Sequence, residues 1–236
     1  MSHRLYRAAS LAVVAAAAAP AFADTITFNA TSGNLAASAS FEATGSNLTV
    51  TLTNTSLFDV LVPADILTAL FFDVDGAPLT LTPVSAVLGP GSVVLFGGPT
   101  DPAPDGVGGE WEYADGILGP SGANYGISSS GLGLFGAGQM FPGANLDGPS
   151  NVDGLQYGIV STGDNPATGN TPVTGSQPLI QDEVVFTMTG LPSGFSVQSI
   201  HNVNWQYGTS LTEPNIPEPA SLALLAMGGL ALLRRR

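Results

Sequence analysis

The chain has 236 residues and a formal net charge of −13, with 18 acidic residues, 5 basic residues and no cysteine. Without cysteine the chain can form no disulfide, no thiol nucleophile and no thiolate metal site. A strongly acidic surface repels polyanions, which excludes nucleic acid as a partner.

The five basic residues lie only near the two ends of the chain. Arg4 and Arg7 stand near the start and three arginines stand at the end, and all 18 acidic residues lie between them. Positive charge beside an apolar segment is typical of sequences that are directed to a membrane. We therefore expect a membrane-directed segment at each end of an acidic body.

Residues 1–23 have the features of a secretion signal. Two arginines precede the apolar run Ala8–Ala19, and Ala21 and Ala23 fit the small-residue pattern that signal peptidase cleaves. The apolar run has 12 residues, which is too short to span a bilayer. We expect signal peptidase to cut after Ala23.

Residues 24–214 predict one β domain. Thr25–Ala30, Ala36–Ala43 and Leu48–Asn54 alternate apolar with small polar residues, as half-buried strands do, and Leu67–Gly76 begins as a buried apolar strand and ends in an Asp-Gly turn. Further strands are expected within residues 78–88, 92–98, 155–161, 182–191 and 195–209. Many short strands separated by Gly, Pro and Asn predict an all-β fold, here a single antiparallel β-sandwich of jelly-roll type.

Three segments are predicted to be irregular. Gly97–Asn124 and Gly131–Gly154 are rich in Gly and Pro and are expected to form loops at one end of the sandwich, with a short strand at Glu110–Tyr113. Ser210–Pro219 is expected to form a short stalk that leads to the tail.

The acidic and histidine side chains do not form a recognisable catalytic pattern. His201 is the only histidine in the body, and no serine lies in a G-x-S-x-G motif, so a nucleophilic triad is not expected. Glu110 and Glu112 flank Trp111, but residues two apart on a strand share one face at about 7 Å. A glycosidase needs two carboxylates across a cleft, so we expect no enzyme.

Two constellations suggest binding. Asp73 and Asp75, followed by Gly76, resemble the start of a calcium loop, although Asp-Gly is also a common turn and the remainder of the EF-hand pattern is missing. Trp111 and Tyr113 are candidates for stacking against a sugar ring, although core filling is the more frequent role of such residues. Calcium is therefore the candidate ion, and no other cofactor is expected.

Residues 215–236 form a three-part tail. The parts are Pro217, Glu218 and Pro219, then the apolar run Ala220–Leu233, then Arg234, Arg235 and Arg236. Fourteen helical residues span about 21 Å, less than the roughly 30 Å of a hydrocarbon core. Arginine side chains extend the effective span by snorkelling, and the positive-inside rule places them in the cytoplasm. We therefore predict a transmembrane helix.

This tail resembles the PEP-CTERM sorting signal of Gram-negative bacteria. The resemblance implies recognition by exosortase, a membrane-embedded cysteine protease-like enzyme, and removal of the tail during export. It also implies a host that makes exopolysaccharide and biofilm matrix. The resemblance covers residues 215–236 alone, so it concerns the sorting of the protein and not the role of its body.

The combined prediction is an exported, non-enzymatic structural protein of the cell surface or extracellular matrix. Signal peptidase and exosortase are its expected processing partners, with a transient inner-membrane anchor and with exopolysaccharide as the candidate ligand. One alternative is a calcium-assisted carbohydrate-binding module, and another is an exported glycan hydrolase.

Overall fold

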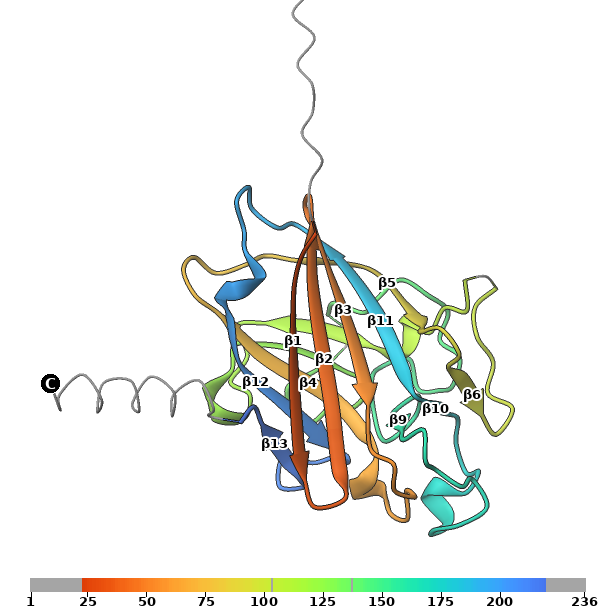
Figure 1. Cartoon of the computed structure of the whole chain (residues 1–236). Helices are drawn as coiled ribbons and strands as arrows, with labels where there is room; N and C mark the ends of the chain where they lie inside the picture. Colours follow the sequence, from red (N-terminus) through yellow and green to blue (C-terminus); the bar gives the residue numbers. More distant parts are fainter. Residues whose placement is uncertain (1–22, 103, 137, 220–236) are drawn as a thin grey trace, which may run out of the picture.

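The computed structural model describes residues 23–102, 104–136 and 138–219, which form two β-sheets joined by loops and short 3-10 turns (Figure 1). The first sheet has the order β1-β2-β3-β11-β5. Its strands are β1 (Asp24–Ser32), β2 (Leu35–Thr44), β3 (Asn47–Asn54), β11 (Glu183–Thr189) and β5 (Thr82–Leu88).

The second sheet has the order β13-β12-β4-β9-β10-β6, with β8 paired to β4 and β7 paired to β8. Its strands are β13 (Asn215–Pro217), β12 (Ile200–Tyr207), β4 (Leu67–Val74), β9 (Ile159–Val160), β10 (Leu179–Gln181), β6 (Val93–Leu95), β8 (Tyr125–Ser128) and β7 (Glu112–Asp115). The 3-10 turns are η1 (Pro63–Asp65), η2 (Gly108–Glu110), η3 (Pro120–Gly122), η4 (Thr171–Val173) and η5 (Val197–Ser199).

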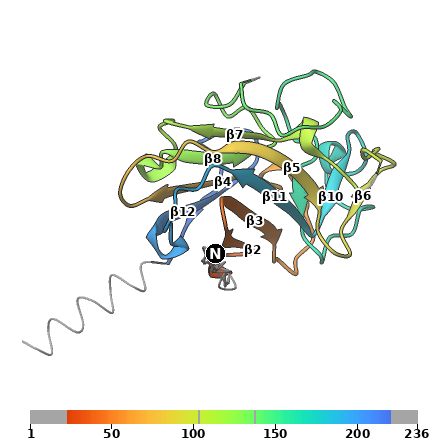
Figure 2. The same ribbon diagram turned by 90° about the horizontal axis from the view of Figure 1, so that it is seen from above.

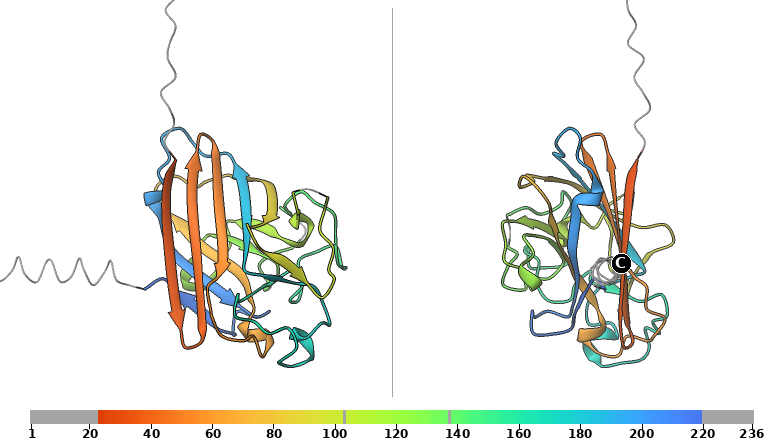
Figure 3. Two further views of the ribbon diagram at one scale, coloured as in Figure 1. Left: turned by 45° about the vertical axis from the view of Figure 1, so that its right-hand side comes forward. Right: turned by 60° about the vertical axis from the view of Figure 1, so that its left-hand side comes forward.

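The first three strands form an antiparallel meander, seen side by side in Figure 3. Two-residue turns connect them, and each turn begins with a glycine of positive φ, Gly33 (59°) and Gly45 (62°). Only glycine adopts this conformation without steric cost, and it matches the twist of the flanking strands. Every second side chain of β2 and β3 is buried, as the alternating sequence predicts.

The main core lies between the two sheets. Phe41 of β2 meets Phe72 of β4 with ring centroids 5.2 Å apart, and Phe186 of β11 contacts Trp111 at 5.0 Å and Phe141 at 5.2 Å. Figure 2 shows β4 and β8 of the second sheet on one side and β2 and β3 of the first sheet on the other. Aromatic side chains therefore supply much of the buried apolar surface.

Strand β4 is buried on both faces from Leu67 to Phe72, which explains its mostly apolar sequence. Phe72 faces the main core, whereas Ala69 and Phe71 belong to a second cluster with Phe135 and Val152. Phe135 and Val152 come from the Gly-rich stretch 131–154, which therefore covers the outer face of the second sheet. This stretch lies beyond β7 and β8 in Figure 2.

The all-β prediction is confirmed, and three finer predictions differ from the structure. Strand β9 pairs in parallel with β10, so the second sheet is mixed and not purely antiparallel. The jelly-roll order is not confirmed, because β1, β2 and β3 are direct neighbours in one sheet. The Gly-rich stretch 131–154 is not an end loop, because it covers a sheet face, whereas in Gly97–Asn124 the strand β7 overlaps the short strand expected at Glu110–Tyr113.

Candidate functional site

The Pro-Glu-Pro segment is attached to the second sheet. Strand β13 pairs antiparallel with β12, with Ile216 opposite Trp205, as the neighbouring strands in Figure 1 show. Ile216 is 4% exposed and belongs to the main core. The prediction of a stalk over Ser210–Pro219 is therefore wrong for Asn215–Pro217, because burying Ile216 and pairing the backbone favour the docked strand.

Glu218 is held by two hydrogen bonds beyond the end of β13. Its backbone N–H donates to the carbonyl oxygen of Val203 at 2.8 Å. Its side-chain Oε1 accepts from the backbone N–H of Asn202 at 2.8 Å. Pro219, the next residue, is exposed. The body thus engages both the backbone and the carboxylate of Glu218.

Asn202 can present its N–H to Glu218 because β12 is irregular at this point. The register between β12 and β4 shifts between His201 and Asn204, and Asn202 has a φ of 52°. Asparagine is enriched in this left-handed region among residues with a Cβ. Its side-chain Nδ2 donates to Asp73 Oδ2 at 2.8 Å and to the carbonyl oxygen of Ser121 at 3.3 Å, which fixes the irregular segment.

The connection between β12 and β13 is also tightly bonded. The buried Gln206 donates through Nε2 to the carbonyl oxygens of Tyr207 at 2.8 Å and Ser210 at 2.9 Å. The Glu213 carboxylate accepts from the N–H groups of Thr209 at 2.6 Å and Ser210 at 2.9 Å. These bonds satisfy the turn backbone and direct β13 back along β12.

Sequence reasoning missed Asn202 and Ile216 as anchors of this segment. The alternation of apolar residues in 200–207 is imperfect, which is the pattern that a bulge produces in a strand. Ile216 is the apolar residue nearest the motif within an otherwise polar and Pro-containing segment. Both signals are present in the sequence, but neither identifies the contact partner.

Asp73 has a structural role in the same region. Its Oδ1 accepts from the backbone N–H of Asn124 at 2.9 Å and from the Asn124 side-chain Nδ2 at 2.8 Å, while Oδ2 accepts from Asn202. Burial alone would raise the pKa of Asp73, but the amide donors of Asn202 and Asn124 outweigh it and hold the pKa below its ordinary value. Both carboxylate oxygens are therefore already engaged.

Asp75, the other half of the predicted calcium pair, lies apart from these contacts. Its side chain is 80% exposed, and Oδ1 is 3.8 Å from His201 Nε2, a pairing that carries charge only when the histidine is protonated. Within the described ranges, no group of three or more His, Asp or Glu side chains is placed to hold a metal ion. Among the described residues, Asp73 and Asp75 therefore have no third His, Asp or Glu side chain placed to complete a calcium site with them.

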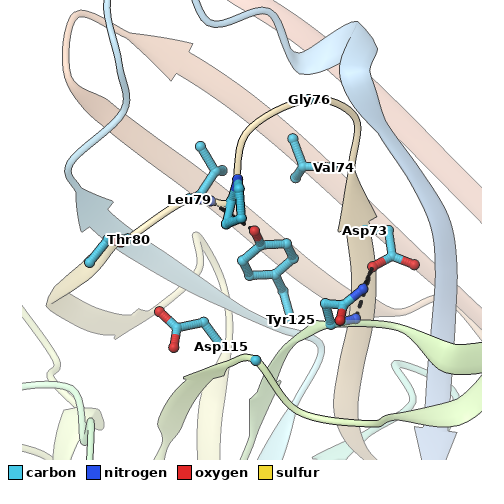
Figure 4. A pocket seen from close by; sticks show the side chains of 10 residues that line it. Asp73, Val74, Gly76, Leu79, Thr80, Asp115 and Tyr125 are labelled. Atoms are coloured by element: carbon cyan, nitrogen blue, oxygen red, sulfur yellow. Dashed lines mark hydrogen bonds between the residues drawn. The ribbon is translucent and has the colours of Figure 1, made fainter.

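A polar pocket of about 430 Å³ lies beside Asp73 (Figure 4). Tyr125 forms part of its wall, with its hydroxyl oxygen accepting from the N–H of Leu79 at 2.8 Å. Asp73 and Asp115 lie on opposite sides of Tyr125 in Figure 4. The pocket therefore offers carboxylate, amide and backbone groups for hydrogen bonding.

Trp111 and Tyr113 are not stacking platforms. Both side chains are 0% exposed and belong to the main core. The carbohydrate-stacking hypothesis is wrong for these two residues, and the core-filling alternative describes them. The space between two sheets needs large apolar side chains, and these two aromatics help to fill it.

Glu110 and Glu112 are buried and accept hydrogen bonds from loop backbones. Glu110 Oε1 accepts from the N–H of Leu146 at 2.5 Å and from that of Asp147 at 3.1 Å. Glu112 accepts from the N–H of Gly136 at 2.7 Å. Burial raises the pKa of both glutamates, against the opposing effect of these amide donors. Both carboxylates therefore bind the backbone of residues 131–154, the loop layer over the outer face of the second sheet.

A second pair of carboxylates, Asp59 and Asp164, joins two loops. Asp59 accepts from the Thr168 hydroxyl and from the N–H of Asn165, and these donors lower its pKa. Asp164 Oδ1 accepts from the N–H of Val60 at 3.0 Å, while its buried Oδ2 has no hydrogen-bond partner among the described residues. Burial raises the pKa of Asp164 to about 6, and the nearby Asp59 carboxylate adds to the rise.

Residues 215–236 match the family described as the PEP-CTERM protein-sorting motif. The chain carries a PEP-CTERM sorting motif. Such a motif marks an exported protein that exosortase processes. No curated protein and no solved structure matches the chain.

The described residues include some of the predicted processing positions. Pro217 and Glu218 of the PEP-CTERM motif are docked as described, and Ala23 is exposed directly before β1. Several predicted positions lie outside the described residues, namely Ala21, the apolar run Ala220–Leu233, Arg234, Arg235 and Arg236. Across the residues that are described, no helix combines the length and apolar character needed to cross a bilayer.

Proposed function

We propose that this exosortase-sorted protein is a structural, non-enzymatic component of the cell surface or extracellular matrix. Signal peptidase removes residues 1–23, and the apolar segment Ala220–Leu233 holds the precursor in the inner membrane. Exosortase then removes the tail and releases the body to the surface. The observation that carries the proposal is the PEP-CTERM motif at residues 215–236, whose first residues form the last strand of a folded all-β body.

The chemistry of the body supports a structural role. Its acidic side chains are used largely as acceptors for backbone N–H groups, as at Glu110, Glu112 and Asp101, which accepts from Ala144. No Lys or Arg lies between Arg7 and Arg234. The carboxylates therefore contribute to fold stability and to a uniformly acidic surface, which keeps an exported protein soluble.

Intact-mass analysis of protein recovered from the cell surface tests the sorting pathway. We expect a mature chain that starts at Asp24 and lacks Arg234, Arg235 and Arg236. A Glu218→Ala precursor should remain in the membrane fraction, because the motif resemblance places recognition at this residue. Surface protein that keeps its C-terminal arginines would contradict the proposal.

Carbohydrate binding is the second candidate function, and the pocket beside Tyr125 favours it. Its volume of about 430 Å³ lies in the range of small-molecule sites, and Asp115 and Asn124 supply groups that bind hydroxyls. The test is a pull-down of the body with the exopolysaccharide of the host. Binding that Asp115→Ala weakens would support this function, and no retention of the wild-type body would contradict it.

A further inference from the structure

The body of the protein holds its own sorting motif as an edge strand. Three kinds of contact act together: the pairing of β13 with β12, the burial of Ile216, and the two hydrogen bonds of Glu218 to Asn202 and Val203. Strand β13 is the terminal strand of its sheet, and β12 is its neighbour in both the sheet and the sequence. The docked segment therefore forms a hairpin with the strand that precedes it.

The docked segment uses backbone and side-chain groups that a peptidase would need to bind in its own cleft. Enzymes that cleave peptides bind an extended backbone and its side chains in a cleft, so a strand within a folded sheet must first open locally. The N–H of Glu218 and one oxygen of its carboxylate are already bonded to the body. An enzyme that reads Pro217 and Glu218 must break these bonds.

We propose that the edge of β12 at Asn202–Gln206 is a docking site for the protein's own Asn215–Glu218 segment, and that exosortase acts only on the undocked form. This proposal rests on the proposed exosortase sorting. The body then sets the rate of its own processing, because the apparent rate is the rate for the free segment multiplied by the undocked fraction.

Docking precedes recognition in time. A hairpin forms within about 1–10 μs once both strands are present, whereas diffusion to a membrane enzyme and its action are far slower. The turn at residues 208–214 keeps the two strands together, because Gln206 and Glu213 form hydrogen bonds with its backbone. Exosortase consequently meets a docked motif and depends on its opening.

A disulfide across the hairpin tests this dependence. Gln206 and Asn215 are directly opposite each other, a spacing that suits a disulfide, and the chain has no other cysteine. The double variant Gln206→Cys/Asn215→Cys should form the bond in the oxidising periplasm. The single variants Gln206→Cys and Asn215→Cys cannot lock the hairpin, and Gln206→Cys also reproduces the loss of the Gln206 turn bonds that the double variant suffers. All retain Pro217, Glu218 and Pro219.

Tail removal is followed by pulse-chase labelling in cells that contain exosortase, with the disulfide verified by mass. The locked variant should be processed at least about tenfold more slowly than both single variants. Only modest stabilisation of the docked form is needed to lower the undocked fraction tenfold. A locked variant processed as fast as the single variants would overturn the proposal while leaving exosortase sorting intact. If the wild-type chain keeps its arginines, both proposals fail.

A loosening variant supplies the opposite measurement and does not depend on disulfide formation. Ile216→Ala removes the buried anchor and leaves the three motif residues unchanged. We expect faster tail removal and, in the full chain, at least about tenfold faster hydrogen exchange at the Glu218 amide, since loss of a buried isoleucine favours local opening. Faster amide exchange with unchanged processing would overturn the proposal.

Discussion

Glu112 shows how single carboxylates stabilise a body that has no lysine or arginine. The side chain is 4% exposed, and its oxygens accept from the backbone N–H groups of Gly136 and Gln139. A buried carboxylate of this kind is tolerated because several amide donors compensate for the loss of water. The loop layer depends on such acceptors.

The first prediction concerns this acceptor. Glu112→Ala should lower the free energy of unfolding by about 1–3 kcal/mol, because it leaves buried N–H groups without a partner. Glu112→Gln should lose less, since its amide oxygen still accepts a hydrogen bond. Urea denaturation measures the difference, with the exposed Glu42→Ala as control. Equal losses for Glu112→Ala and Glu42→Ala would contradict the assignment.

The second prediction uses the raised pKa of Asp164. Its ordinary value is 3.8 and its pKa in the folded body is about 6, so the folded state favours the protonated form. The resulting stabilisation is fully present below pH 3.8 and is lost as the pH rises through 6. The melting temperature of the wild-type body should therefore fall between pH 4 and pH 7.

Asp164→Asn tests this pH dependence, because it resembles the protonated carboxyl at every pH. The variant should show a smaller fall in melting temperature across the same interval. Part of the fall in melting temperature should remain in this variant, because burial also raises the pKa of Glu110 and Glu112. Asp75→Asn at an exposed position is the control, and a wild-type slope in Asp164→Asn would refute the prediction.

Among the larger elements, the loop layer over the second sheet behaves as a distinct unit. The described residues of 131–154 contain no strand, yet Phe135 and Val152 pack on Ala69 and Phe71 of β4. The Phe71 and Phe135 rings lie 5.9 Å apart. The layer therefore docks on the sheet through a few apolar side chains, while the main core lies on the other face.

The third prediction follows from this separation. Phe135→Ala should speed cleavage of the layer by thermolysin about tenfold or more, because loss of a buried phenylalanine ring favours local opening. The two sheets should keep the wild-type circular dichroism spectrum. Trypsin is unsuitable, since the body contains no lysine or arginine. Resistance equal to that of the wild type would show that Phe135 does not anchor the layer.

At the scale of the whole molecule, the distribution of charge is the dominant feature. Every lysine and arginine is absent from the body, so its acidic groups repel one another without nearby cations to offset them. Among the described residues, His201 with Asp75 is the one pairing of a basic with an acidic side chain; it lies at the surface and is an ion pair only when the histidine is protonated. Hydrogen bonds to backbone amides compensate locally, but the long-range repulsion persists.

The fourth prediction is a dependence of stability on salt. Screening acts over about 10 Å at 0.1 M salt, so the melting temperature of the body should rise with sodium chloride. Calcium and magnesium at matched ionic strength should give equal further shifts, because the oxygens of Asp73 are engaged by amides. A larger shift with calcium that Asp73→Asn/Asp75→Asn abolishes would instead establish the calcium site.

The sequence by itself determined the class of the fold and the export route. Period-2 alternation specifies half-buried strands because adjacent side chains of a strand point to opposite faces, and the continuous apolar run Ala69–Phe72 of β4 indicates burial on both faces. The PEP-CTERM motif is likewise a local pattern, confirmed at residues 215–236. Such properties depend on the order of neighbouring residues, so they can be read without knowing the fold.

The tertiary structure alone decided which residues meet. Trp111 and Asp115 lie close in the sequence, yet one fills the core and the other lines a pocket. Glu218 binds Asn202 because a register shift in β12 exposes the N–H of Asn202 to it. Strand β11 pairs with β3 although the two strands lie far apart in the sequence. These outcomes depend on packing between distant segments, where burial and backbone pairing are settled together, and no local pattern encodes them.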